Sequence, residues 1–162
     1  MAFIKSIIAI NIAILSHQFL EAQNSFSPEY SAILDSSKGA ALMEQCTRCT
    51  PRGITNFWNI TESDKVKIEV NFKKILHLKS SVCSTTYPND SLQTVEHYLY
   101  QYIGVNIAGR KLVYINAFVA RDTKDRWKTE PVNVCDGGKG FWGALFDIES
   151  LEFSQLSFND AG

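Results

Sequence analysis

Apolar positions follow a helical spacing in the first half of the chain and mostly alternate after residue 97. The first helical segment is predicted over residues 27–45, which begin Ser-Pro-Glu, the order of an N-cap, a first-turn proline and a first-turn acid. Gly39 lies in the middle of this segment, so two short helices are an alternative to one. The Thr-Pro-Arg-Gly sequence at residues 50–53 then ends regular structure.

Residues 61–78 fit two patterns. Every second position from Val66 to Phe72 is apolar, as in a strand, but apolar residues also recur at helical spacing from Ile68 to Leu76. The spacing of Thr61 and Asp64 is that of a helix-capping pair. The length of the segment and this cap favour a helix, followed by a loop over residues 80–91.

Two long alternating runs, residues 98–107 and 111–119, are predicted to form a hairpin. Ala-Gly at residues 108–109 fits a two-residue turn. This turn places Gln101 opposite Asn116. Shorter strands are predicted at residues 131–135, 141–146 and 151–158, and the apolar phase of the last one slips near residues 154–155, as a β-bulge would cause.

Helical segments before a series of hairpins indicate the α+β class. We expect two N-terminal helical segments packed on one face of an antiparallel sheet of about five strands. Alternation directs the aliphatic residues of strand 98–107 towards the helices and its tyrosines towards the opposite face. That second face must be covered or used for binding. We expect partial cover and a binding face containing Tyr100, Tyr102 and Trp142, with ordinary strand propensity as the alternative explanation of the rings.

The N-terminus has the pattern of a secretory signal peptide at residues 1–22. Lys5 precedes an apolar run at residues 7–15, which is shorter than the roughly 20 residues of a membrane span. Ala22 is a suitable small residue before a cleavage point, and the absence of a cysteine there disfavours a lipid anchor. A core helix or a retained anchor is the alternative. We therefore expect a secreted or periplasmic protein without a stable membrane anchor, and one domain over residues 23–162.

Charge and composition restrict the class of partner. The chain has 16 Lys and Arg against 17 Asp and Glu, for a net charge of −1. A nearly neutral protein has no strong field to attract nucleic acid, so the expected partner is another protein. The sequence carries no indication of an oligomeric state.

Four cysteines, an even number, indicate disulfides in an exported chain. Of the three possible pairings, we favour Cys46–Cys49 with Cys83–Cys135. The CxxC motif at residues 46–49 follows a predicted helix, which is the wrong end for stabilising a redox thiolate. No cofactor or metal is predicted, because a zinc site would need two more ligands with paired spacing.

No catalytic residue is predicted, although three features could be taken for functional motifs. Asp136 lies in an Asp-Gly-Gly sequence typical of a turn, and the glycines of residues 137–140 lack the spacing of a phosphate-binding loop. Asn59 and Asn89 begin glycosylation sequons, which matter only in a eukaryotic source. The favoured hypothesis is a non-enzymatic binding protein of the inhibitor or immunity type. The alternatives are a hydrolase that uses Asp136 with a histidine, and a structural component of the cell envelope.

The C-terminal half resembles a group of uncharacterised exported bacterial proteins with a QYxG…IYxN…CDGG…FNG pattern. The corresponding residues here are 101–104, 113–116, 135–138 and 158–160, with Asn159-Asp160 in place of Asn-Gly. The resemblance covers residues 92–159. It implies an exported α+β domain and assigns no activity or catalytic residue.

Secretion is expected to remove the first 22 residues, because the polar end of the apolar run and Ala22 match a cleavage site. N-terminal sequencing or intact mass of the exported protein should give a chain that starts at Gln23. An exported protein that keeps Met1 would contradict the signal peptide.

Overall fold

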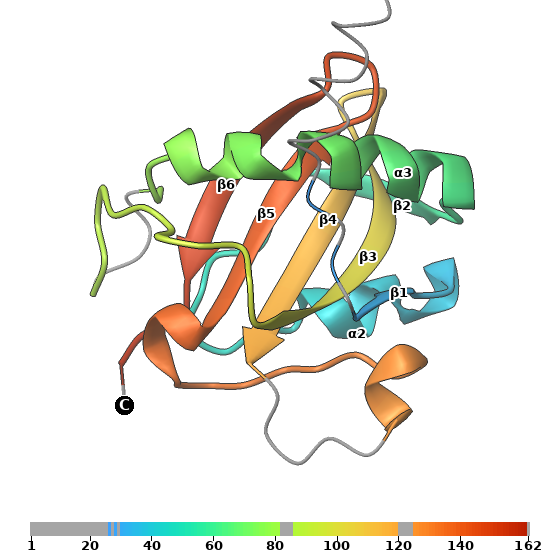
Figure 1. Cartoon of the computed structure of the whole chain (residues 1–162). Helices are drawn as coiled ribbons and strands as arrows, with labels where there is room; N and C mark the ends of the chain where they lie inside the picture. The colour runs from blue at the N-terminus through green and yellow to red at the C-terminus, as the bar shows by residue number, and fades with distance from the viewer. Residues whose placement is uncertain (1–25, 27, 29, 82–85, 120–124, 162) are drawn as a thin grey trace, which may run out of the picture.

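A computed structural model of the chain describes residues 26, 28, 30–81, 86–119 and 125–161 (Figure 1). A six-stranded mixed sheet forms its centre. The strands are β1 (Ser31–Ile33), β2 (Ile54–Trp58), β3 (Tyr98–Ile107), β4 (Arg110–Val119), β5 (Phe141–Asp147) and β6 (Glu152–Phe158). The helices are the 3₁₀ turn Ser36–Lys38 with α2 (Gly39–Met43), α3 (Glu62–Asn71) with the 3₁₀ turn Phe72–His77, and the 3₁₀ turns Asp125–Lys128 and Gly138–Gly140. The α+β class is confirmed.

The strand order is β1-β3-β4-β5-β6, and β2 pairs with the second half of β3. The predicted hairpin register is confirmed, with Ile107 opposite Arg110 and Gln101 opposite Asn116. Ala108 and Gly109 have φ of 50° and 79°, the left-handed conformations that a tight hairpin turn requires. The bulge in β6 is also confirmed, because the pairing with β5 shifts there and Gln155 has a φ of 53°.

The helix favoured for residues 61–78 is confirmed. Asp64 N–H donates to the Thr61 hydroxyl oxygen, and Thr61 N–H donates to the Asp64 carboxylate, so the capping box is complete. The buried side of the helix, with Ile68 and Phe72, packs on the sheet face that carries Tyr100, Tyr102 and Trp142.

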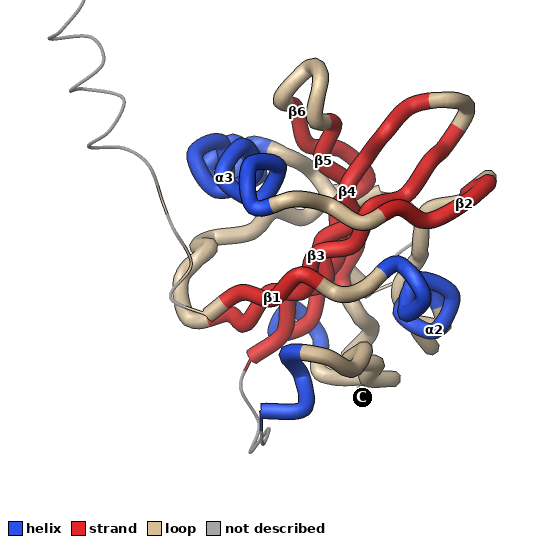
Figure 2. Tube along the Cα trace, turned by 90° about the vertical axis from the view of Figure 1, so that its right-hand side faces the viewer, coloured by secondary structure: helices blue, strands red, loops and turns tan. Residues whose placement is uncertain are grey.

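Placing both helical segments on one face was wrong. Leu42 of α2 packs with Ile103 and Tyr114, which belong to the other face of the sheet. Figure 2 shows α2 and α3 on opposite sides of the sheet. Both faces of β3 and β4 are therefore covered along most of each strand, which explains why seven consecutive residues of each strand are buried.

The start of the predicted first helix is a strand instead. Residues 31–33 pair in parallel with β3, and Leu34 N–H donates to the Tyr102 carbonyl oxygen. These residues form a strand because the edge of β3 is open there. β2 pairs only with the Gly104–Ile107 half of β3 and leaves the backbone groups of the other half for β1. The helical part is reduced to residues 36–43.

The predicted strand at residues 131–135 is not part of the sheet. The segment has no strand pairing, and side chains rather than a neighbouring strand bind its backbone. The alternation of the sequence could not show whether the hydrogen bonds of this extended backbone come from a neighbouring strand or from side chains.

The favoured disulfide pairing was also wrong. Cys46 is bonded to Cys135, with 4.7 Å between the Cα atoms and 89 residues between them in sequence. Cys49 is disulfide-bonded too, and the remaining cysteine, Cys83, lies outside the described residues.

The predicted signal peptide at residues 1–22 also lies outside the described residues. No helix in the described part of the chain is long and apolar enough to cross a membrane.

Candidate functional site

The predicted binding residues come together in the interior of the protein. Tyr100, Tyr102 and Trp142 are each 0% exposed, and the Tyr100 ring lies 5.8 Å from Trp142 and 6.4 Å from Tyr102 between centroids. The expectation that both tyrosines stay accessible was therefore wrong. Their face is the one that α3 covers, and burial raises the pKa of both hydroxyls. These rings are core, so a site must lie elsewhere.

The opposite face of the sheet contains a polar row that crosses four strands. Gln101 pairs with Asn116, Asn116 with Gly143 and Gly143 with Ser157, so all four positions share one face. The three side chains of the row are at most 1% exposed. The row separates the apolar cluster around Ile103 from the cluster around Phe118.

The two amides of the row bind the segment that was expected to be a strand. Gln101 donates to the carbonyl oxygens of Trp127 and Glu130, and its own oxygen accepts from Val132 N–H at 3.0 Å. Asn116 donates to the Val132 carbonyl and to the Gln101 oxygen, both at 2.9 Å. Each buried polar group of the pair thus has a partner, which is what makes its burial tolerable.

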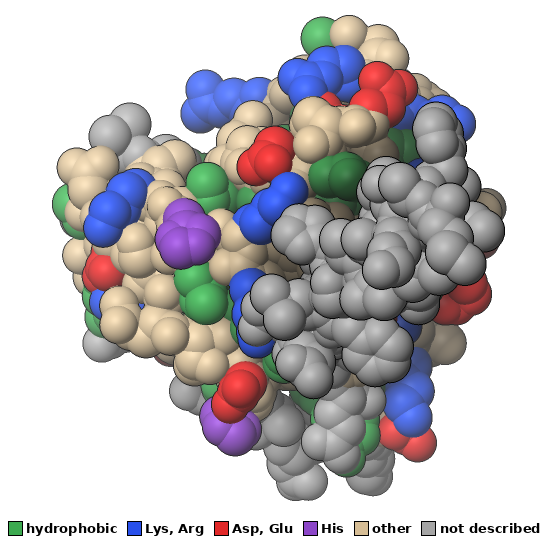
Figure 3. Space-filling view, turned by 45° about the horizontal axis from the view of Figure 1, so that its top comes forward, with side chains coloured by type: hydrophobic (Ala, Val, Ile, Leu, Met, Phe, Trp, Pro, Cys, Tyr) green, Lys and Arg blue, Asp and Glu red, His purple; other side chains and the backbone are tan. Residues whose placement is uncertain are grey.

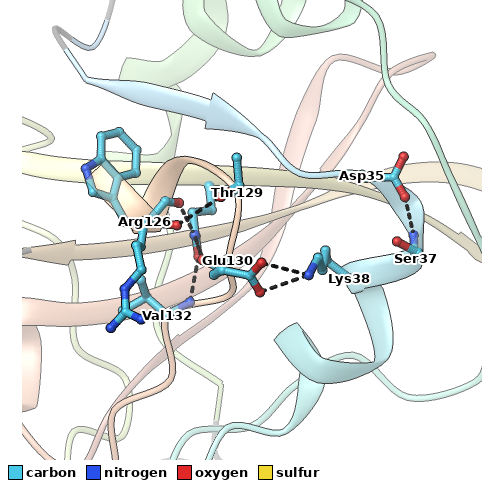
Figure 4. A network of polar contacts seen from close by, with 9 residues as sticks. Asp35, Ser37, Lys38, Arg126, Thr129, Glu130 and Val132 are labelled. Atoms are coloured by element: carbon cyan, nitrogen blue, oxygen red, sulfur yellow. Dashed lines mark hydrogen bonds and ion pairs between the residues drawn. The ribbon is translucent and has the colours of Figure 1, made fainter. Parts of the chain in front are cut away.

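The same segment is attached to the helical side of the protein. Glu130 forms an ion pair with Lys38 at 2.9 Å, next to the turn that Asp35 caps by accepting from Ser37 N–H (Figure 4). Further along, Asn159 donates to the carbonyl oxygens of Val134 and Asp136. With the Cys46–Cys135 disulfide, these contacts hold residues 127–136 against the sheet from end to end.

Arg48 lies over the polar row, and its charge has no counter-ion in the described part of the chain. The residue is 5% exposed, Nη2 donates to the Asn116 oxygen, and the guanidinium carbon lies 5.9 Å from the Tyr114 ring centroid. Among the described residues, Arg48 makes no ion pair, and its Nε is buried without a hydrogen-bond partner. A buried cation without an anion costs on the order of several kcal/mol, so this arrangement is unusual for a purely structural residue.

Beyond Arg48 the chain forms one wall of a cleft of about 390 Å³, which we call the Arg52 cleft. Cys49 N–H donates to the Ser157 hydroxyl at 3.1 Å and so joins this wall to the polar row. Among the described residues, the lining consists of Cys49, Thr50, Arg52, Ser81 and Gln155. Within the part of the chain that the structure describes, the side chains of Thr50, Arg52 and Gln155 make no hydrogen bond or ion pair.

A second cleft, of about 270 Å³, lies on the other side of Gln155 and contains Arg110 and Asp147. These two residues form an ion pair, and Glu152, the third charged residue of the described lining, pairs with Lys74. Partial burial by itself raises the pKa of the Asp147 carboxyl, but two backbone N–H donors in the following turn and the Arg110 guanidinium outweigh it and lower that pKa. Of the two clefts, only the Arg52 cleft contains a cation, Arg52, without an ion pair to a described residue.

The residues of the hydrolase alternative are not brought together at either cleft. Asp136 is exposed, and neither it nor His77 or His97 lines either of these two clefts. Gly137 and Gly138 have φ of 98° and 56°, as predicted for a turn. Among the described residues, no group of three or more His, Cys, Asp and Glu side chains could hold a metal ion.

On the face seen in Figure 3, basic and acidic side chains are interspersed.

Sequence reasoning placed Gln101 opposite Asn116 but missed what the pair does. The signal was present, because two amides facing each other on an otherwise apolar strand face need partners from a third segment.

Comparisons with protein-family models, with curated proteins and with solved structures gave no match.

We expect Asn116→Ala to lower the free energy of unfolding by about 2–4 kcal/mol, because it leaves the Gln101 oxygen, the Val132 carbonyl and Arg48 each short of a buried partner. Asn133→Ala is the matched control, since Asn133 is exposed and bonds only residues at the surface. Urea unfolding of both variants tests this, and equal losses would show that the buried amide has no special role.

Proposed function

We propose that this protein is a non-enzymatic binding domain that acts outside the cytoplasm, in the manner of inhibitor or immunity-type proteins, and that the Arg52 cleft receives part of a partner protein. The observation that carries the proposal is the set of free side chains at this cleft. Thr50, Arg52 and Gln155 offer a hydroxyl, a guanidinium and an amide that no described group of the protein uses. A small number of precisely placed polar groups is typical of binding sites.

The frame around the cleft supports the same conclusion. One wall is the chain after Cys46, which the disulfide to Cys135 and the hydrogen bond from Cys49 N–H to Ser157 attach to the rest of the protein. The other wall is the bulge of β6. A bulge is often found beside a functional site, where it redirects a side chain. Gln155 has a left-handed backbone, which is unfavourable for a residue other than glycine. A site held in this way loses little conformational entropy when a partner binds.

The proposed compartment follows from the cysteines. Disulfides persist in oxidising environments and are rare in a reducing cytoplasm. Cys46 and Cys135 are both exposed, so a cytoplasmic thiol pool would have access to their bond. The predicted signal peptide supports the same location.

Site-specific photocrosslinking tests the proposal. We expect a photoreactive amino acid at position 50 to give one discrete protein adduct in extracytoplasmic extract of the source organism, and an excess of unlabelled protein to abolish it. Lys73 is the matched control position, because it is exposed on the opposite side of the sheet and makes no hydrogen bond or ion pair with the described residues. No adduct, or equal adducts from both positions, would count against a binding site at this cleft.

A further inference from the structure

We infer that the group bound in the Arg52 cleft is a carboxylate, presented by an acidic segment of a polypeptide. The inference rests on the proposed function, and it specifies the chemistry of the same site. It follows from the charges around the cleft, from the donors that line it and from its size.

The first argument is the imbalance of charge. Arg52 is exposed in the cleft without an ion pair to any described residue. Arg48, four positions earlier, also lacks a counter-ion among the described residues, but it is buried beside Asn116 and does not line the cleft. The acids of the neighbouring part of the sheet are already paired, Asp147 with Arg110 and Glu152 with Lys74. Arg52 is thus the one charge of the described lining, and a ligand can neutralise it.

The second argument is the kind of donor. A guanidinium presents parallel N–H groups that match the two oxygens of a carboxylate. Thr50 and Gln155 add a hydroxyl and an amide N–H₂ from the two walls of the cleft. These groups surround an anion with donors, while Gln155 and Thr50 can also accept from the N–H groups of a peptide backbone.

The third argument is size. The volume of about 390 Å³ falls in the range of roughly 300–1,000 Å³ found for sites that enclose organic ligands. A bare phosphate or sulfate would satisfy the charge but would leave most of this space unused. A side-chain carboxylate with the peptide units on either side of it is closer in size to this volume, and Arg52 is among the residues that line it.

The test is a titration of the ¹⁵N-labelled full-length mature protein, followed by NMR. The probes are a capped peptide of alternating Glu and Gly, the same peptide with Gln in place of Glu, and inorganic phosphate. We expect saturable shifts of the Thr50, Arg52 and Gln155 backbone signals with the Glu peptide, and no saturation with the Gln peptide. Phosphate should compete only weakly.

Two charge-matched variants give the test its specificity. Arg52→Gln should weaken binding of the Glu peptide by about tenfold or more, the loss of one charge-assisted pair. Arg126→Gln removes an equally exposed guanidinium from the turn Asp125–Lys128 and should leave binding unchanged.

Equal binding of both peptides, equal loss in both variants or no saturable binding would overturn the carboxylate assignment. Tighter binding of phosphate than of the Glu peptide would also overturn it, in favour of an adventitious ion only. A crosslinked partner that persists in the Arg52→Gln variant would preserve the proposed function and reject this inference alone.

Discussion

The buried amide pair of Gln101 and Asn116 is the interaction on which the rest of the structure depends. Backbone groups that leave water must find hydrogen-bond partners, and a segment without strand or helix cannot supply its own. The chain that follows the 3₁₀ turn Asp125–Lys128 obtains such partners from this pair, which binds the backbone of Trp127, Glu130 and Val132 from the β3–β4 hairpin. An irregular segment can therefore cover part of the sheet face on which α2 also packs, while α3 covers the other face.

The amide pair also explains the position of the cleft. Asn116 bonds Arg48 on one side and the 127–133 segment on the other, so the two segments that Cys46–Cys135 joins are both fixed to one strand residue. The chain beyond Arg48 is then directed along the polar row to Ser157 and the bulge of β6. Of the three free side chains of the cleft, Gln155 lies on β6, while Thr50 and Arg52 lie in the irregular segment that Ser157 and the Cys46–Cys135 disulfide attach to the sheet.

Features set by local chemistry could be predicted, and those set by distant packing could not. The hairpin register, the Thr61–Asp64 capping box and the β6 bulge depend on neighbouring residues, and all three are confirmed. The accessibility of Tyr100 failed because the face that a helix covers depends on the whole topology. The disulfide pairing failed for the same reason, since 89 residues separate Cys46 from Cys135. Of the site, only the Gln101–Asn116 pairing was predicted, while the free side chains of the cleft carry no pattern in sequence.

Hydrogen exchange at Val132 tests the central claim most directly. Its N–H donates to the buried Gln101 oxygen and lies in a segment without strand pairing. If the amide pair holds this segment to the sheet, Val132 N–H should exchange only through global unfolding, with a protection free energy equal to that of the β3 and β4 core amides. Exchange as fast as that of an exposed loop amide, such as Gly109, would contradict the account.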